Sequence, residues 1–238
     1  MVKEQFDLFD NNWVKPEEKP VEVPGTDHFD NIEELLGLSE RAYQTVISAQ
    51  MNEALAISDL ESYIYKIFSA GRGHKSRAGA RSAAEKVAFD RGDPLVRIVL
   101  QAAYRVDHEI HRFMGLLRFN PRPDGIWLAR CAPDNFILPA FAGHFTARFG
   151  QAPWAIIDEK RSLALLRLEG EDPCFGILSS FPFLSSPEAP QDDWEELWRS
   201  YHRSINIDNR KNPALQLQFM PRRYWKYLPE LKSYSETE

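Results

Sequence analysis

The sequence predicts an α+β protein in which helices precede and follow one block of strands. Three observations predict this class. Apolar residues recur at helical spacing before residue 113, short apolar runs separated by turn residues occupy residues 115–169, and helical spacing returns after residue 193. We expect a central antiparallel-type ββαββ block flanked by N-terminal helices and a C-terminal helical cap. The 238 residues, 43% of them hydrophobic, are enough to bury such a core.

The first 28 residues differ from the rest in composition. Residues 13–28 contain Pro16, Pro20 and Pro24 among alternating charges, a pattern that excludes a helix or a central strand. We therefore expect a stiff linker between the folded part and the N-terminal stretch QFDLF (residues 5–9).

Helical spacing predicts two helices between residues 31 and 68, the first of them capped by Asp30. Residues 70–81 contain three glycines and four Lys/Arg, which indicates a basic loop or a frayed helix start before a helix over 82–90. Asp93-Pro94 then opens a long helix, because proline is favoured at the first helical position.

Two predicted hairpins surround a helix in the central block. Asp124-Gly125 is typical of a turn, which we expect between strands over 115–120 and 126–132. Asp134 is the predicted cap of a helix that ends near Phe149. A second hairpin covers 154–170, a loop covers 171–192, and an amphipathic helix ends near Ile205. One or two short helices, broken at Pro221, complete the chain. The predicted parts are residues 1–28 (peptide and linker), 29–92 (helical region), 93–230 (α+β domain) and 231–238 (disordered tail).

The charge is unevenly distributed. The whole chain has a net charge of −6, whereas residues 1–70 carry −9 and residues 71–238 carry +3, so a polyanion site should lie in the C-terminal two-thirds. Cys131 and Cys174 are too few for a cysteine-rich metal cluster, and reduced thiols are favoured over a single disulfide. There is no apolar run of membrane-spanning length and no signal pattern, so we expect a cytoplasmic protein without membrane contact.

Candidate catalytic groups are few. Asp158 and Glu159 lie at a predicted hairpin turn, where a carboxylate beside Lys160 is a plausible acid–base pair and a solvated hairpin tip is the favoured interpretation. His111 and His144 are the histidines that would assist. There is no GxxxxGK[ST], GxGxxG or GxSxG motif and no metal-binding spacing, so we expect no cofactor and no metal.

Cations interleaved with aromatic residues near the C-terminus indicate nucleic-acid binding, since cations bind phosphates and flat rings stack on bases. The alternative is ordinary packing, in which the aromatic rings lie in a core and arginine stems cover it. The predicted nucleic-acid-binding residues are Arg118, Arg148, Lys160, Arg161, Arg210, Arg222, Arg223 and Trp225.

Three separated stretches carry a family resemblance: EIHRFMGLLRF (109–119), APDNFILPAFAGHFTARF with WAIIDEKR (132–149 and 154–161), and LWRSYHRSINIDNRKNPALQLQFMPRRYW (197–225). They resemble a bacterial domain of unknown function labelled a probable DNA metabolism protein, over about residues 80–228. Its members accompany a radical-SAM protein with a DNA-modification or repair role, and a related domain is fused to a uracil-DNA-glycosylase-superfamily domain. The first 70 residues depart from the family pattern. The matching positions are His111, Arg118, His144, Arg148, Asp158, Lys160, Arg161, Arg210, Asn212, Pro213, Gln216, Pro221, Arg222 and Trp225.

The resemblance implies partners. Two cysteines 43 positions apart cannot supply the three neighbouring thiolates of a radical-SAM cluster, so a partner would perform the radical chemistry. The stretch QFDLF resembles the bacterial sliding-clamp-binding peptide. Leu8 and Phe9 would fill an apolar pocket, Gln5 would bind its rim and Asp7 would add a polar contact. The alternative is an arm that packs Phe6, Leu8 and Phe9 against the domain.

Three hypotheses follow. The first is a DNA-repair or DNA-modification accessory protein that binds DNA, works with a radical-SAM enzyme and is tethered to the clamp. The second is a nucleic-acid-processing hydrolase or glycosylase-like enzyme that uses Asp158 or Glu159 with His111 or His144. The third is a scaffold without DNA contact.

Overall fold

The computed structural model describes residues 32–185, 193–205, 207, 210 and 212–231. These residues form two compact units. The helical unit comprises the described residues up to His111 together with Asp134–Ile137, and the sheet unit comprises Arg112–Pro133 and the described residues from Leu138 onward. The predicted clamp-binding peptide, the linker and the tail after Leu231 lie outside the described residues.

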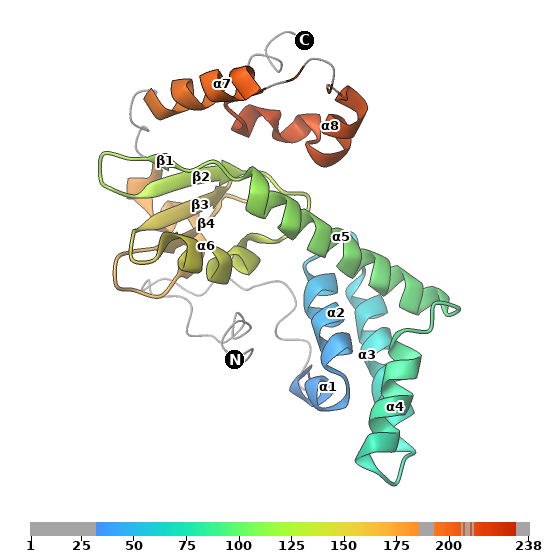
Figure 1. Cartoon of the computed structure of the whole chain (residues 1–238). Helices are drawn as coiled ribbons and strands as arrows, with labels where there is room; N and C mark the ends of the chain where they lie inside the picture. Colours follow the sequence, from blue (N-terminus) through green and yellow to red (C-terminus); the bar gives the residue numbers. More distant parts are fainter. Residues whose placement is uncertain (1–31, 186–192, 206, 208–209, 211, 232–238) are drawn as a thin grey trace. The chain divides into compact units, whose positions relative to one another are not determined.

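Serine caps set the helix boundaries of the helical unit. Ser39 separates two helices where one was predicted, because its Oγ accepts the Ala42 N–H at 3.1 Å. Ser76 likewise accepts the Gly79 N–H at 3.1 Å, so the fourth helix begins earlier than the glycines suggested. The helices are α1 (Ile32–Leu38), α2 (Glu40–Gln50), α3 (Ile57–Arg72), α4 (Arg77–Ala88) and α5 (Pro94–Leu116), which begins at the predicted proline (Figure 1).

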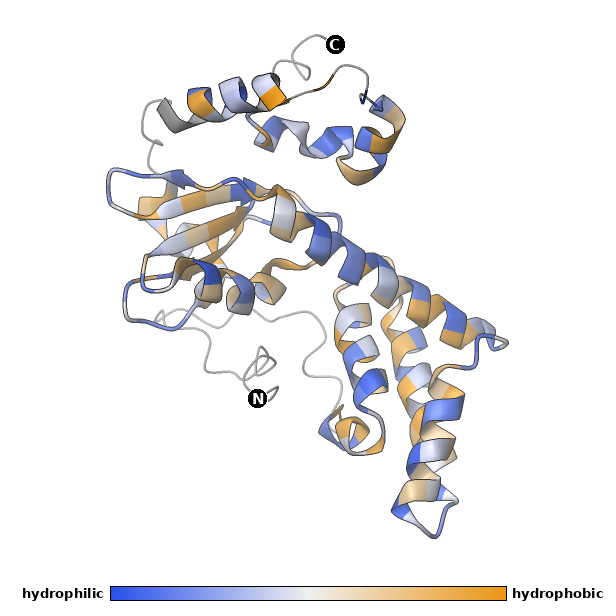
Figure 2. Ribbon diagram, in the orientation of Figure 1, coloured by the Kyte–Doolittle hydropathy of each residue, from blue (hydrophilic) through white to orange (hydrophobic). Residues whose placement is uncertain are grey.

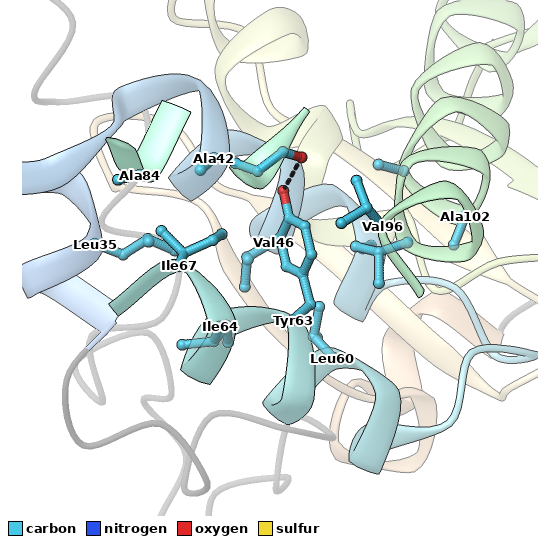
Figure 3. Close-up of a cluster of buried hydrophobic side chains, with 14 residues drawn as sticks. Leu35, Ala42, Val46, Leu60, Tyr63, Ile64, Ile67, Ala84, Val96 and Ala102 are labelled. Atoms are coloured by element: carbon cyan, nitrogen blue, oxygen red, sulfur yellow. Dashed lines mark hydrogen bonds between the residues drawn. The ribbon is translucent and has the colours of Figure 1, made fainter. Parts of the chain in front are cut away.

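One apolar core holds this unit together. Residues from α1 to α5 contribute to it, among them Leu35, Val46, Ile67 and Val96 (Figure 3). Tyr63 lies in the middle, fully buried, and its hydroxyl donates to the Ala88 carbonyl at 3.1 Å, which joins α3 to the end of α4. Burial raises the pKa of Tyr63, so the hydroxyl stays protonated as a donor.

The sheet unit is built on five strands in sequential order, β1-β2-β3-β4-β5. Three neighbouring pairs are antiparallel, and β2 pairs with β3 in parallel. The parallel pair arises because the chain returns through the 3-10 helix η3 (Leu138–Phe141) and the helix α6 (Ala142–Phe149). The strands are β1 (Asn120–Pro121), β2 (Trp127–Cys131), β3 (Trp154–Asp158), β4 (Leu163–Arg167) and β5 (Cys174–Ile177).

The predicted ββαββ order is confirmed, with corrections at its ends. The first strand is short because α5 continues to Leu116, through residues predicted to be strand. The predicted turn is correct: Gly125 has φ +83°, and the Arg122 N–H donates to the Ile126 carbonyl across it at 3.0 Å. Asp134 does not cap a helix, since α6 begins only at Ala142. The loop predicted over 171–192 contains a fifth strand.

Both faces of the sheet are covered. On β3, Ala155 and Ile157 belong to a core with Phe181, which follows the 3-10 helix η4 (Leu178–Ser180), and Leu184 of the 3-10 helix η5 (Pro182–Ser185). Alternation then places Trp154 and Asp158 on the opposite face, where the Trp154 ring lies 6.1 Å from the ring of Phe145 of α6. Every residue of β3 is consequently buried, including its last one.

The C-terminal part comprises α7 (Asp193–Ile205), α8 (Pro213–Phe219) and the 3-10 helix η7 (Arg222–Tyr227), with the predicted break at Pro221. Asn212 caps α8, because its Oδ1 accepts the Leu215 N–H at 3.0 Å. Hydrophobic and hydrophilic residues alternate along both α-helices (Figure 2). No helix within the described ranges is long and apolar enough to cross a membrane.

Candidate functional site

The carboxyl ends of the parallel strands β2 and β3 meet at one edge of the sheet, where Cys131 pairs in register with Asp158. Asp158 is fully buried and its Oδ2 lies 2.6 Å from the Arg161 guanidinium. Its Oδ1 accepts the N–H groups of Lys160 and Arg161, at 3.0 and 3.3 Å. Burial raises the pKa of Asp158, and the Arg161 guanidinium acts in the opposite direction.

These contacts give Asp158 and Arg161 a structural role. Arg161 also donates to the Pro133 carbonyl at 3.2 Å, so the pair joins the β3–β4 turn to the chain that follows β2. Both oxygens of Asp158 are held, and its side chain has no exposed surface to present to a substrate. The solvated tip that the sequence favoured is correct for Lys160, which is exposed, and wrong for Asp158.

Glu159 connects this edge to the C-terminal part of the chain. It accepts a hydrogen bond from the Tyr227 hydroxyl at 2.7 Å and one from Lys226 at 3.2 Å, and Arg130 lies 3.7 Å away. Burial acts to raise the pKa of Glu159, but the hydrogen bonds from Tyr227 and Lys226 outweigh it and the pKa is lowered. Burial and Glu159 raise the pKa of Tyr227. Glu159 is thus an ionised anchor for η7.

Glu230 anchors the C-terminal part at a second point. Its carboxylate accepts from Arg118 at 2.7 Å and from the Trp198 indole at 3.1 Å, and Arg199 donates to the neighbouring Pro229 carbonyl at 3.2 Å. Burial acts to raise the pKa of Glu230, but the hydrogen bonds that its carboxylate accepts and the charge of Arg118 together outweigh burial, and the pKa is lowered. Arg118, predicted to bind nucleic acid, is therefore held by Glu230, which also binds Trp198 of α7.

Cations that are exposed define a different surface. Arg222 lies over the Trp225 ring at 5.8 Å, and Arg223 lies over the Tyr224 ring at 4.7 Å and donates to its hydroxyl at 3.0 Å. Both arginines are exposed. Trp225 is half-buried, and its indole donates to the Met220 carbonyl at 2.8 Å. Arg210 is also exposed. We call this set (Arg210, Arg222, Arg223 and Trp225) the C-terminal basic surface.

The remaining candidates lie elsewhere. Arg148 is exposed on α6, where it lies 6.0 Å over the Phe149 ring. His144, also exposed on α6, packs edge-on against Phe145 at 4.8 Å. His111 is exposed on α5 and belongs to the helical unit, whereas Asp158 and Glu159 belong to the sheet unit. Among the described residues, no three His, Cys, Asp or Glu side chains are grouped to hold a metal ion.

A family model for a domain of unknown function, DUF4130, matches residues 59–230. The match covers well over half of the 238 residues. The chain belongs to the DUF4130 family. Searches of curated proteins and of solved structures found no significant match.

The DUF4130 region ends with the anchor Glu230 and contains the Asp158–Arg161 pair and the C-terminal basic surface. Sequence reasoning missed three residues that organise this region, namely Arg130, Tyr227 and Glu230. Their partners lie 29, 68 and 112 positions away. No local spacing could have indicated these contacts.

Proposed function

We propose that this DUF4130 protein is a DNA-repair or DNA-modification accessory protein that binds nucleic acid through the C-terminal basic surface. The observation that carries the proposal is a charge reversal. Residues 197–228 contain seven Lys/Arg and one Asp, net +6, in a chain whose total is −6. The same segment contains five Trp and Tyr residues. Cations beside flat rings suit a phosphate backbone with unpaired bases.

The contacts of the individual residues support this surface more than the sheet edge. Arg118 and Arg161 are paired with carboxylates, whereas Arg210, Arg222 and Arg223 are exposed. Tyr201 of α7 exposes 53% of its surface and Trp198 exposes 39%, which leaves ring area for stacking. The predicted contribution of Arg118 and Arg161 to DNA binding is therefore indirect, through the position of the C-terminal helices and the turn.

Fluorescence anisotropy with labelled single-stranded DNA tests the proposal. Arg210→Ala/Arg222→Ala/Arg223→Ala should weaken binding at least about tenfold at low salt and reduce the salt slope by about 2 to 3, since each phosphate contact contributes roughly 0.7 to 0.9 to that slope. Lys86→Ala/Arg97→Ala/Arg105→Ala removes the same charge from exposed positions of the helical unit and is the matched control. Equal losses in both variants would contradict the proposed surface.

The enzyme hypothesis has less support. A general base must reach the proton that it removes, and both oxygens of Asp158 are already hydrogen-bonded inside the sheet unit. Glu159 is more accessible, but two cations and a tyrosine stabilise its ionised form. Turnover of an oligonucleotide by wild type and by Glu159→Gln separates the two hypotheses. An enzyme that uses Glu159 would lose turnover in the variant, whereas an accessory protein shows no turnover in either form.

A radical-SAM partner belongs to the same proposal. What supports it, besides the resemblance, is apolar surface beside the basic residues: Leu197 and Ile205 of α7 and Phe219 of α8 each expose more than half of their surface. Co-purification of the two proteins should succeed, and Leu197→Ala/Ile205→Ala should weaken it. An unchanged yield with this variant would exclude α7 as the contact.

The sliding clamp is proposed as a second partner, through Gln5, Asp7, Leu8 and Phe9. The support is the sequence pattern of QFDLF and its separation from the family-matched region by the proline-rich residues 13–28. Leu8→Ala/Phe9→Ala should abolish clamp binding while Asn11→Ala/Asn12→Ala, in the same segment, preserves it. Clamp binding that survives the first variant would contradict this role.

A further inference from the structure

The hairpin formed by α3 and α4 ends in a basic tip, residues 72–77. Arg72, Lys75 and Arg77 lie in these six residues, and every residue from Arg72 to Ala78 is exposed. No Asp or Glu occurs between residues 62 and 84. The tip is therefore a concentration of positive charge on the unit that does not carry the C-terminal basic surface.

Packing holds the base of the hairpin rigid. α3 and α4 contact each other extensively. Ile67 of α3 and Ala84 of α4 are fully buried in the same apolar core (Figure 3). Gly71, the residue before the tip, is buried, and a Cβ added there would lie 3.3 Å from Leu38. At the end of α4 away from the tip, the Tyr63 hydroxyl of α3 donates to the Ala88 carbonyl. The charges of the tip are thus presented by an ordered element.

Two other cations of the helical unit have carboxylates within ion-pair distance. Lys66 is paired with Asp93, and Arg41 lies 3.7 Å from Glu85. Arg72, Lys75 and Arg77 have no carboxylate partner within the described part of the chain. The N-terminal end of α4 adds its positive dipole end at the same place. Mutual repulsion of these charges favours an external polyanion, because an anion relieves it.

The surroundings of the tip decide which polyanion fits. No large hydrophobic side chain of the described residues is exposed between Tyr65 and Ile98, and Figure 2 colours the connection between α3 and α4 mainly as hydrophilic. The tip therefore offers cations and the small ring of His74, but no exposed Trp, Tyr, Phe or aliphatic side chain. A phosphate backbone needs only cations, and duplex DNA presents the densest array, roughly one charge per 1.7 Å of helix axis.

We propose that the basic tip is a second DNA-binding surface, which contacts the phosphate backbone of duplex DNA without sequence preference. The inference rests on the proposed function only for the class of ligand. It assigns different structures to the two surfaces: the tip binds paired DNA, and the C-terminal basic surface, with its exposed rings, binds unpaired strands. A duplex with a single-stranded extension then contains a ligand for each surface.

Anisotropy with three labelled DNAs tests the assignment: a duplex, a single strand, and a duplex with a single-stranded extension. Arg72→Ala/Lys75→Ala/Arg77→Ala should weaken duplex binding at least about tenfold at low salt and lower its salt slope by about 2 to 3. Single-strand binding should change by less than about twofold. Lys86→Ala/Arg97→Ala/Arg105→Ala should behave as wild type. Thermal unfolding by circular dichroism verifies that the variants are folded.

The outcomes separate this inference from the function on which it rests. The inference alone is overturned if the tip variant has no effect on duplex binding while single-strand binding is lost in Arg210→Ala/Arg222→Ala/Arg223→Ala. Absence of DNA binding by the wild-type protein overturns both. Competition with polyglutamate gives a further test. If polyglutamate displaces labelled duplex as effectively as unlabelled duplex does, the inference is overturned, because the tip would then recognise negative charge in general.

Discussion

Asp158 illustrates how burial changes the role of a side chain. It is the last residue of β3, it has no exposed surface, and its closest partner is the Arg161 guanidinium at 2.6 Å. A charge taken out of water is tolerated only when a partner and hydrogen bonds replace the lost hydration. Arg161 and two backbone N–H groups replace it here, and the consequence is a fixed turn between β3 and β4.

Asp158→Ala should lower the free energy of unfolding by about 3 kcal/mol, because it leaves the mostly buried Arg161 charge without its carboxylate. Asp158→Asn should cost less, since an amide oxygen still accepts the Lys160 N–H. Urea unfolding of both variants measures the difference. Losses below about 1 kcal/mol in both would mean that the pair is well solvated.

The contribution of Glu230 to the free energy of unfolding should depend on pH. Its pKa is lower in the folded chain than the ordinary value of 4.5, so the ionised form stabilises the fold above that pH. The stabilisation is lost as the pH falls through the lowered pKa. Glu230→Gln should therefore be less stable than wild type by about 2 kcal/mol at pH 7, as expected for a partly buried ion pair that loses one partner.

The difference in stability between the two proteins should shrink as the pH falls below 4.5 and disappear once the Glu230 carboxylate is protonated in wild type as well. Urea unfolding across this pH range provides the measurement. A difference that does not change with pH would show that Glu230 acts through packing and not through its charge.

At the scale of elements, the sequence correctly predicted those boundaries that depend on a few adjacent residues. Asp93-Pro94 marks the start of α5, Asp124-Gly125 forms the turn, and Pro221 separates α8 from η7. Each of these depends on the backbone preferences of two or three adjacent residues. The Ser39 cap, which divides the first predicted helix, was missed because apolar spacing continues across it.

Elements that depend on distant partners were not predictable in the same way. β5 lies in a stretch rich in proline, serine and acidic residues, and it is a strand because β4 offers a free edge. β2 and β3 are parallel because the chain crosses over through α6 between them, and the residue pattern of the strands does not indicate this direction. The hydrogen bonds from Lys226 and Tyr227 to Glu159 and from Arg118 to Glu230 join residues 67 to 112 positions apart. These contacts position the candidate surface.

Two glycines give opposite predictions at this scale. Gly125 has φ +83°, a conformation that costs any L side chain, so Gly125→Ala should lower the free energy of unfolding by about 1 kcal/mol. Gly37 lies within α1 and nothing would contact an added Cβ, so Gly37→Ala should raise stability by up to about 1 kcal/mol. Thermal unfolding of both variants checks the signs, and equal signs would contradict the assigned backbone conformations.

At the scale of the whole molecule, charge is segregated along the chain. The first 70 residues carry −9, while the segment 197–228 carries +6 and the tip of the α3–α4 hairpin carries only cations. Composition predicted that a polyanion would bind the C-terminal two-thirds. It could not predict which arginines remain exposed, because Arg118 and Arg161 differ from Arg210 and Arg222 only in what the fold brings near them.

One measurement tests the central claim most directly: anisotropy of the wild-type protein with single-stranded DNA across a salt series from about 50 to 300 mM. Binding through Arg210, Arg222, Arg223 and neighbouring cations predicts that log K falls with log salt with a slope of about −3 or steeper. Absence of binding at the lowest salt, or an affinity that does not change with salt, would contradict a nucleic-acid-binding role for this DUF4130 protein.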